Sequence, residues 1–214
     1  MPEFVASYLS VSFAMRGVLM DILYRGAKQE DCPKIATCIY HAADDVLDYL
    51  FEDNAANMSA TQVLTCGLEN EQSYDSYKSV IVAEYEQNVV GAVQSYPFRY
   101  HGIDDEMRSF FSEERLNRFE DFYDVRVENS LLVNAMFVDP DFRHRGIGTG
   151  LLSHAKTKAQ SLGFDKLSLF VLADNSNAQR LYLSFGFTLA KEIRLSGVFN
   201  ASRKEEIYLM NCDI

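Results

Sequence analysis

The residues best suited to chemistry lie in one glycine-rich stretch, Arg143-His-Arg-Gly-Ile-Gly-Thr-Gly150. It follows an apolar run and opens a segment with helical periodicity. Three glycines allow the backbone to approach a ligand closely and to aim successive N–H groups at it. A helix that begins here adds a partial positive charge. Residues 143–158 contain no acid but four basic residues, Arg143, Arg145, Lys156 and Lys158. The stretch therefore predicts a site for a phosphate-bearing ligand.

Two common nucleotide-binding motifs do not fit this stretch. A Walker A loop needs a lysine directly after its last glycine, and none follows here. The dinucleotide-binding fingerprint needs a third glycine at position 151, where Leu151 stands. A glycine-rich turn without a ligand would leave the two arginines unexplained. We therefore expect a phosphate ligand of another kind.

A second motif follows one predicted helix and one predicted strand later. It consists of Asn175-x-x-Ala178-x-x-Leu181-Tyr182 and then Phe185-Gly186-Phe187. Together with Val138-x-Pro140 and Arg143-x-x-Gly146-x-Gly148, it resembles the motifs of the GCN5-related N-acetyltransferase (GNAT) superfamily. The resemblance extends in element order over about residues 20–210 and is sharp over residues 133–187. Two motifs in the right order are far more specific than either one alone.

The resemblance implies that the chain uses acetyl-CoA to acetylate a primary amine by direct attack in a ternary complex. Three strand residues would pair with the pantetheine arm through their main chain, the loop amides would hold the pyrophosphate, and Asn175 would hydrogen-bond the arm. Tyr182 would be the catalytic residue that protonates the departing thiolate, although its spacing also suits a core aromatic residue. The implied cofactor-binding residues are Met136, Phe137, Val138, Arg143, His144, Arg145, Gly146, Ile147, Gly148, Thr149 and Asn175.

The general base is harder to place. An alkylammonium group has a pKa near 10 and must lose a proton before it attacks a thioester. Many members of the superfamily carry a carboxylate on the strand before the glycine loop, but the only polar residue at 131–135 is Asn134. Glu84, Asp124, Glu128 or a water chain are the alternatives. The missing carboxylate also leaves open a second function, a non-catalytic acyl-CoA-binding sensor or interaction module.

The acceptor has to be inferred from charge. Asp44, Asp45 and Asp48 lie in an early helical region and favour a cationic amine, unless they simply form a solvated helix face. The aromatic segment 96–102 is expected to line the acceptor side. A small-molecule and a protein acceptor both fit, as do an acetyl and a longer acyl group, and a homodimer is left open.

The scaffold that must position these residues alternates between strand and helix periods. We predict strands at 22–25, 80–86, 89–96, 131–138, 167–171, 187–193 and 206–210, with a hairpin turn at Gln87-Asn88. Helices are predicted at 28–52, 60–68, 113–122, 149–162 and 175–185. This order indicates a mixed α/β sheet. The resemblance implies a mostly antiparallel, splayed sheet flanked by helices.

Length and composition set the remaining limits. The 214 residues suit one domain, which we place at residues 20–214, with an insertion at about 97–129 and an N-terminal extension at 1–19. A net charge of −11 argues against nucleic-acid and anionic-membrane partners, and no apolar run is long enough to cross a bilayer. The four cysteines and four histidines lack metal-ligand spacing, so no metal is expected. Free thiols suggest a reducing, cytoplasmic location.

Overall fold

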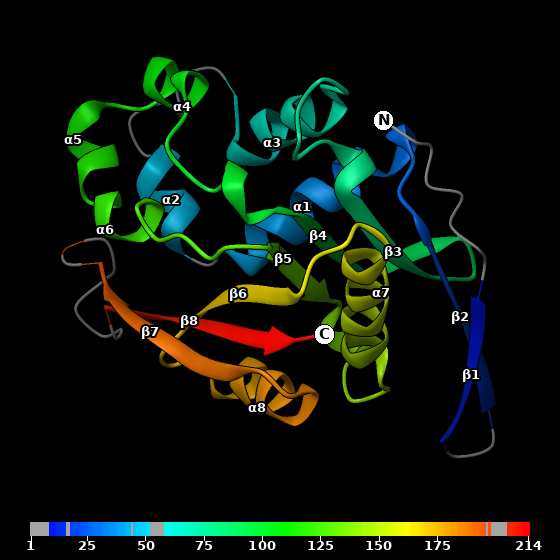
Figure 1. The fold of residues 1–214 in the computed structure, drawn as a ribbon. Helices are drawn as coiled ribbons and strands as arrows, with labels where there is room; N and C mark the ends of the chain where they lie inside the picture. Colours follow the sequence, from blue (N-terminus) through cyan, green and yellow to red (C-terminus); the bar gives the residue numbers. More distant parts are fainter. Residues whose placement is uncertain (1–8, 16–17, 44, 52–57, 196, 198–204) are drawn as a thin grey trace.

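The computed structural model describes residues 9–15, 18–43, 45–51, 58–195, 197 and 205–214 (Figure 1). The strands are β1 (Leu9–Met15), β2 (Val18–Gly26), β3 (Val80–Tyr85), β4 (Asn88–Pro97), β5 (Ser130–Val138), β6 (Lys166–Leu172), β7 (Thr188–Arg194) and β8 (Glu206–Asp213). The helices are α1 (Cys32–Ala42), α2 (Asp45–Phe51), α3 (Ala60–Glu69), α4 (Asp105–Phe110), α5 (Glu113–Asn117), α6 (Glu120–Tyr123), α7 (Ile147–Ser161) and α8 (Ser176–Phe185).

The strands of the described chain form one sheet in the order β1-β2-β3-β4-β5-β6-β8-β7. Every neighbouring pair is antiparallel except β5 and β6, which run parallel. The predicted fold class, a mixed and mostly antiparallel sheet with flanking helices, is therefore confirmed.

The N-terminal part of the sheet is larger than the sequence suggested. Residues 9–15, which we assigned to an extension, form β1 and pair along their whole length with β2. Strand β2 begins at Val18 rather than at Ile22. The hairpin turn lies at Glu86-Gln87, one residue earlier than predicted, because both residues adopt the positive φ that a tight two-residue turn requires (48° and 65°).

Two predicted helices are each divided in the structure. The helical region 28–52 consists of α1 and α2. A second helix beginning at Asp45 is consistent with the preference of acidic residues for the first turn over the helix interior. The helix predicted at 113–122 is divided into α5 and α6 at Phe119, whose φ of −104° and ψ of 6° are not helical. Phe119 is fully buried, so tertiary packing overrides local helix propensity there.

Helices cover both faces of the sheet. Side chains alternate along β3, so Val80 and Val82 pack with α1 and α3 in one cluster. Ile81 and Ala83 pack on the other face, in a cluster that contains side chains of α7 and α8. Figure 1 shows α7 and α8 on the side of the sheet opposite to α1 and α3.

The sheet opens between β5 and β6. These strands pair only from Ser130 to Val133 on β5, and beyond that point β5 pairs with β4 while β6 pairs with β8. The register also shifts there, because Gln94 pairs with Ala135 and Ser95 with Val133, which leaves Asn134 as an extra residue on β5. A β-bulge of this kind bends a strand and redirects a side chain. The loops from β5 to α7 and from β6 to α8 both begin at this opening.

Candidate active site

A cavity of about 1090 Å³ lies at the opening between β5 and β6. Its lining comes from the glycine loop, α8, β5 and β6 and also from α1 to α3 and the 97–129 segment. Eleven of the twelve site residues predicted from the sequence line it, namely Met136, Phe137, Val138, Arg143, His144, Gly146, Ile147, Gly148, Thr149, Asn175 and Tyr182. The exception is Arg145. The fold thus brings together two motifs that are separated by a helix and a strand.

The glycine loop forms a cradle of backbone N–H groups. Gly146 has a φ of 78° and is the N-cap of α7, and His144 also has a positive φ (59°). The first N–H groups of a helix lack intrahelical partners, and they carry the positive end of the helix dipole. A Cβ added to Gly148 would lie 3.0 Å from Leu181 Cδ2, so the loop has little room for a side chain. Such a cradle fits the pyrophosphate of an acyl-CoA.

Tyr24 of β2 packs against the first turns of α7. Its ring is buried, stacks on His154 at a centroid distance of 4.7 Å, and its hydroxyl donates to the carbonyl of Ile147 at 3.4 Å. An ideal Cβ on Gly150 would lie only 2.1 Å from Tyr24 Oη. The third glycine of the motif therefore serves helix packing. Sequence reasoning missed Tyr24, which lies 123 residues before Ile147.

The basic cluster seen in the sequence is dispersed in space. Arg143 donates from Nε to the carbonyl of Val138 at 3.0 Å and lies at the cavity rim. Arg145 lies over the ring of Phe142, with its carbon Cζ 5.4 Å from the ring centroid, and contacts Met20. Lys158 is about 16 Å along α7 from its start. It donates from Nζ to two backbone carbonyls, at 2.9 and 2.7 Å, so it links β4 to the residue that precedes β3 and does not reach the glycine loop.

The β5 residues differ in the direction of their main-chain groups. Asp139 N donates to Val90 O on β4 at 2.9 Å. Because direction alternates along a strand, the main-chain groups of Phe137 also point towards β4. Those of Met136 and Val138 point to the open side. The sequence could not distinguish these two orientations.

Asn175 and Tyr182 reach the cavity from α8. Asn175 is the N-cap of the helix, where its Oδ1 accepts from Ala178 N at 3.1 Å, so its amide NH₂ is the part that faces a ligand. Tyr182 is buried, with its ring centroid 5.8 Å from that of Phe187. Within the described chain its hydroxyl makes no hydrogen bond. Burial raises the pKa of Tyr182 to about 12, so the phenol stays protonated at neutral pH.

None of the three carboxylates proposed as bases reaches the cavity. Glu84 is paired with Arg25 at 2.7 Å, and Asp124 and Glu128 are absent from the lining. The carboxylates that do line the cavity, among the described residues, are Asp75 and Asp104. Asp104 caps α4 and also accepts from Tyr74 Oη, while Asp75 accepts from Ser73.

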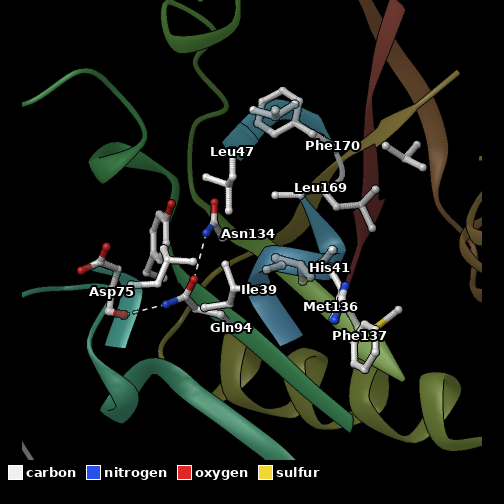
Figure 2. A pocket seen from close by; sticks show the side chains of 18 of the residues that line it. Ile39, His41, Leu47, Asp75, Gln94, Asn134, Met136, Phe137, Leu169 and Phe170 are labelled. Carbon is white, nitrogen blue, oxygen red and sulfur yellow. Dashed lines mark hydrogen bonds between the residues drawn. The ribbon is translucent and has the colours of Figure 1, made fainter. Parts of the chain in front are cut away.

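Asn134 belongs to a chain of amide hydrogen bonds at the base of the cavity. Its Nδ2 donates to Gln94 Oε1 at 2.9 Å, and Gln94 Nε2 donates to the backbone carbonyl of Asp75 at 2.6 Å (Figure 2). The sequence singled out Asn134 but gave no sign of Gln94, which lies 40 residues earlier.

The part of the cavity formed by segment 96–123 is largely aromatic and apolar. Four residues of segment 96–102 line the cavity, namely Tyr96, Tyr100, His101 and Gly102, and their role on an acceptor side stays a prediction. Further lining side chains come from the predicted insertion, namely Phe110, Phe111, Phe119, Phe122 and Tyr123. His101 is buried and its Nε2 bonds the carbonyl of Phe122 at 2.9 Å. Burial lowers the pKa of His101 to about 4, so it is neutral at pH 7.

Of the acidic residues predicted to attract a cationic acceptor, Asp48 of α2 has a described side chain. Asp48 is exposed, bonds Tyr40 and does not line the cavity. Asp44 and the side chain of Asp45 lie outside the described part of the chain. The described α2 residues that do line the cavity are apolar, Val46, Leu47, Leu50 and Phe51.

Neither a metal-binding cluster nor a membrane-spanning helix is present among the described residues. They contain no group of three or more histidine, cysteine, aspartate or glutamate residues that could hold a metal ion. No helix among them has the length and apolar character that crossing a bilayer requires.

Two solved structures that share this fold are described as acetyltransferases. An N-acetyltransferase from Staphylococcus aureus Mu50 matches with a TM-score of 0.64 and 20% identity, over 88% of this chain and 98% of its own. A putative acetyltransferase from Salmonella typhimurium, solved with its cofactor acetyl-CoA, matches with a TM-score of 0.57 and 20% identity, over 90% and 93% of the two chains. At these identities the likeness establishes the fold alone.

Sequence comparison gives closer but shorter matches. The [ribosomal protein bS18]-alanine N-acetyltransferase of Salmonella typhimurium is 45% identical over 66 residues, which is 31% of this chain and 44% of that protein. The chain spans less than half the length of the curated relatives it matches. The model of the acetyltransferase (GNAT) family matches residues 43–187, more than half of the chain. The chain belongs to the acetyltransferase (GNAT) family.

Proposed function

We propose that the protein is an acetyl-CoA-dependent N-acetyltransferase that acetylates a primary amine by direct attack in a ternary complex. The observation that carries this proposal is the meeting of the glycine-loop cradle and the Tyr182 hydroxyl in one cavity, at the point where β5 and β6 separate. Family membership and the Salmonella structure with acetyl-CoA support the choice of donor.

The residues present fit this donor. The N–H groups at the start of α7 bind the pyrophosphate. Gly148 has no side chain, so the pyrophosphate can approach the backbone there. The main-chain groups of Met136 and Val138 are directed to the open side of β5 and bind the amide-containing arm, with the amide NH₂ of Asn175 as a further donor. The donor supplies an activated thioester, and the chain holds that thioester beside Tyr182.

Tyr182 acts as a hydrogen-bond donor to the leaving sulfur. Its pKa of about 12 exceeds the value near 8.5 of an ordinary thiol, so complete proton transfer to the thiolate is uphill. A hydrogen bond that strengthens as negative charge develops on sulfur still lowers the barrier. The Tyr182 hydroxyl has no competing partner in the described chain.

Direct attack is favoured over a covalent acyl-enzyme because three of the four cysteines are buried. Cys32 and Cys38 are buried, and burial raises the pKa of each to about 11. Cys212 is also buried. Cys66 lines the cavity from α3. Replacing it, as in Cys66→Ser, should leave turnover unchanged, whereas loss of turnover would indicate an acylated cysteine.

One observation favours a second candidate, an acyl-CoA-binding sensor. The described carboxylates in the cavity are both engaged in hydrogen bonds, so a general base is not evident. A sensor needs the cradle but not the phenol. Retention of Tyr182, a buried side chain whose hydroxyl has no partner in the described chain, therefore favours the enzyme.

The test is release of free thiol from acetyl-CoA with a panel of primary amines, beside calorimetric titration with coenzyme A. We expect amine-dependent thiol release, and Tyr182→Phe should lower kcat at least tenfold while changing the Kd for coenzyme A less than threefold. Equal losses in both would make Tyr182 a packing residue. Micromolar binding without turnover on any amine would favour the sensor, and absence of binding would refute both.

Two sequence-based expectations stay predictions. One is the division into an extension and a single domain at residues 20–214 with its insertion. The other is a cytoplasmic location, with which the four free cysteines are compatible.

A further inference from the structure

The acceptor half of the cavity is built for an apolar group. Leu47 and Leu50 of α2 line it, while Asp48 between them is exposed and faces away. Phe119 and Phe170 line it from the 97–129 segment and from β6. A second cationic group on the acceptor would lose its hydration here, and the two described carboxylates that line the cavity, Asp75 and Asp104, already accept hydrogen bonds from Ser73, Tyr74 and the start of α4.

Asn134 is the polar group that β5 presents to this apolar space. It lies at the bulge, and its side chain is exposed to the cavity (Figure 2). The two hydrogen bonds behind it fix its orientation. The carbonyl of Asp75 can only accept, so Gln94 must turn its NH₂ to that carbonyl and its Oε1 to Asn134. Asn134 must then donate through Nδ2, which leaves its Oδ1 as an acceptor.

Gln94 makes this orientation rigid because it is 4% exposed and forms both hydrogen bonds, one to the carbonyl of Asp75 and one to Asn134. The amide oxygen of Asn134 therefore offers a fixed hydrogen-bond acceptor in apolar surroundings. It suits a donor N–H, and because it is neutral it does not require a cation. An amine that donates one N–H to Oδ1 has its position fixed while its lone pair stays available.

We propose that the acceptor is a primary amine with an apolar substituent. Its nitrogen donates to Asn134 Oδ1, and its substituent packs against Leu47 and Phe170. This inference rests on the proposed function and assigns its substrate class, and it replaces the cationic acceptor suggested by the acidic run in the sequence. The amine can belong to a free small molecule or to the N-terminus of a peptide that begins with an apolar residue.

The first experiment compares matched acceptors in the thiol-release assay. The amines 3-methylbutylamine and 1,4-diaminobutane are similar in length, but one ends in methyl groups and the other in a second ammonium. We expect kcat/KM to be at least tenfold higher for 3-methylbutylamine. The peptides Leu-Gly-Gly and Lys-Gly-Gly repeat the comparison for α-amino groups, and the better of the two apolar substrates identifies the source of the amine.

Variants test the two halves of the site. Leu47→Asn should lower kcat/KM for 3-methylbutylamine at least tenfold with an unchanged Kd for coenzyme A, whereas the neighbouring control Asp48→Asn should change neither. Asn134→Ala and Gln94→Leu should both raise the KM for amines at least fivefold without raising that for acetyl-CoA. Thermal unfolding of each variant establishes that it is folded.

The outcomes separate the two proposals. Equal or faster reaction with the diamine overturns this inference, as does an amine KM that is unchanged in Asn134→Ala and Gln94→Leu. Either result leaves the proposal of acetyl transfer intact. A folded protein that binds coenzyme A but releases no thiol with any amine overturns the proposed function, and the substrate class with it.

Discussion

Gly150→Ala tests whether the cradle depends on the packing of β2 beneath α7. The added Cβ would lie 2.1 Å from Tyr24 Oη and 2.4 Å from Tyr24 Cζ, where ordinary contacts exceed 3.4 Å. Helix and ring must therefore separate by about 1 Å. The ring has little freedom to move, since it is 3% exposed and stacked on His154.

The expected cost follows from these contacts. Overpacking of a core costs about 1–3 kcal/mol. Loss of the Tyr24–Ile147 hydrogen bond adds up to about 1 kcal/mol, which the better helix propensity of alanine offsets. The net loss of about 1–3 kcal/mol corresponds to a fall in Tm of about 3–10 °C for a chain of this size. Displacing the first turn of α7 should also weaken binding of coenzyme A about tenfold or more.

Thermal unfolding and calorimetry measure both effects. Gly67→Ala is the matched control, because Gly67 also lies in a helix but a Cβ there meets nothing within 4 Å. Its Tm should stay constant or rise slightly. The double variant Tyr24→Leu/Gly150→Ala should lose less stability than the sum of the losses of the two single variants. A Gly150→Ala protein with the Tm and the coenzyme A affinity of the wild type would refute the packing argument.

Three further predictions concern the loop and two buried titratable groups. Gly148→Ala should weaken coenzyme A binding about tenfold by calorimetry and change Tm by less than about 2 °C, because Leu181 Cδ2, 3.0 Å away, ends a flexible side chain. Burial holds the pKa of His101 at about 4, below the unfolded value of 6.5, so the unfolded chain takes up this proton first as pH falls. His101→Phe should therefore lose less stability than the wild type between pH 6.5 and 4 in urea titrations, by up to about 3 kcal/mol, and parallel pH profiles would contradict this. Burial likewise lowers the pKa of Lys158 to about 8, so its contribution to stability should increase from pH 8 to 10.5, and Lys158→Met should abolish that increase without affecting coenzyme A binding.

The sequence predicted what depends on local residues. The glycine loop, the cap at Asn175 and the strand and helix between them occur within about 50 residues, and the structure has them nearly as expected. Spacing in that stretch specifies turns, caps and helix faces, which short-range physics determines.

The features that sequence reasoning missed depend on distant partners. Gln94 orients Asn134, and Tyr24 supports the start of α7, across 40 and 123 residues. Neither pair has a local signature. Lys158 of the basic run shows the opposite case, since it is close to the loop in sequence but a helix length away in space. Of the acidic run, the side chain of Asp48 is described, and it lies on the outer face of α2.

The separation of β5 from β6 has a consequence for self-association. Beyond Val133, one side of β5 carries main-chain groups that no other strand of the described chain pairs with. This part of β5 is therefore an edge strand, although it lies in the middle of the sheet. Exposed edges invite a foreign strand and promote aggregation. Here β6 and α8 lie on the other side of this opening and contribute to its lining. Occupation of that opening by a bound donor would close it, and we expect the protein to aggregate more slowly when coenzyme A is present.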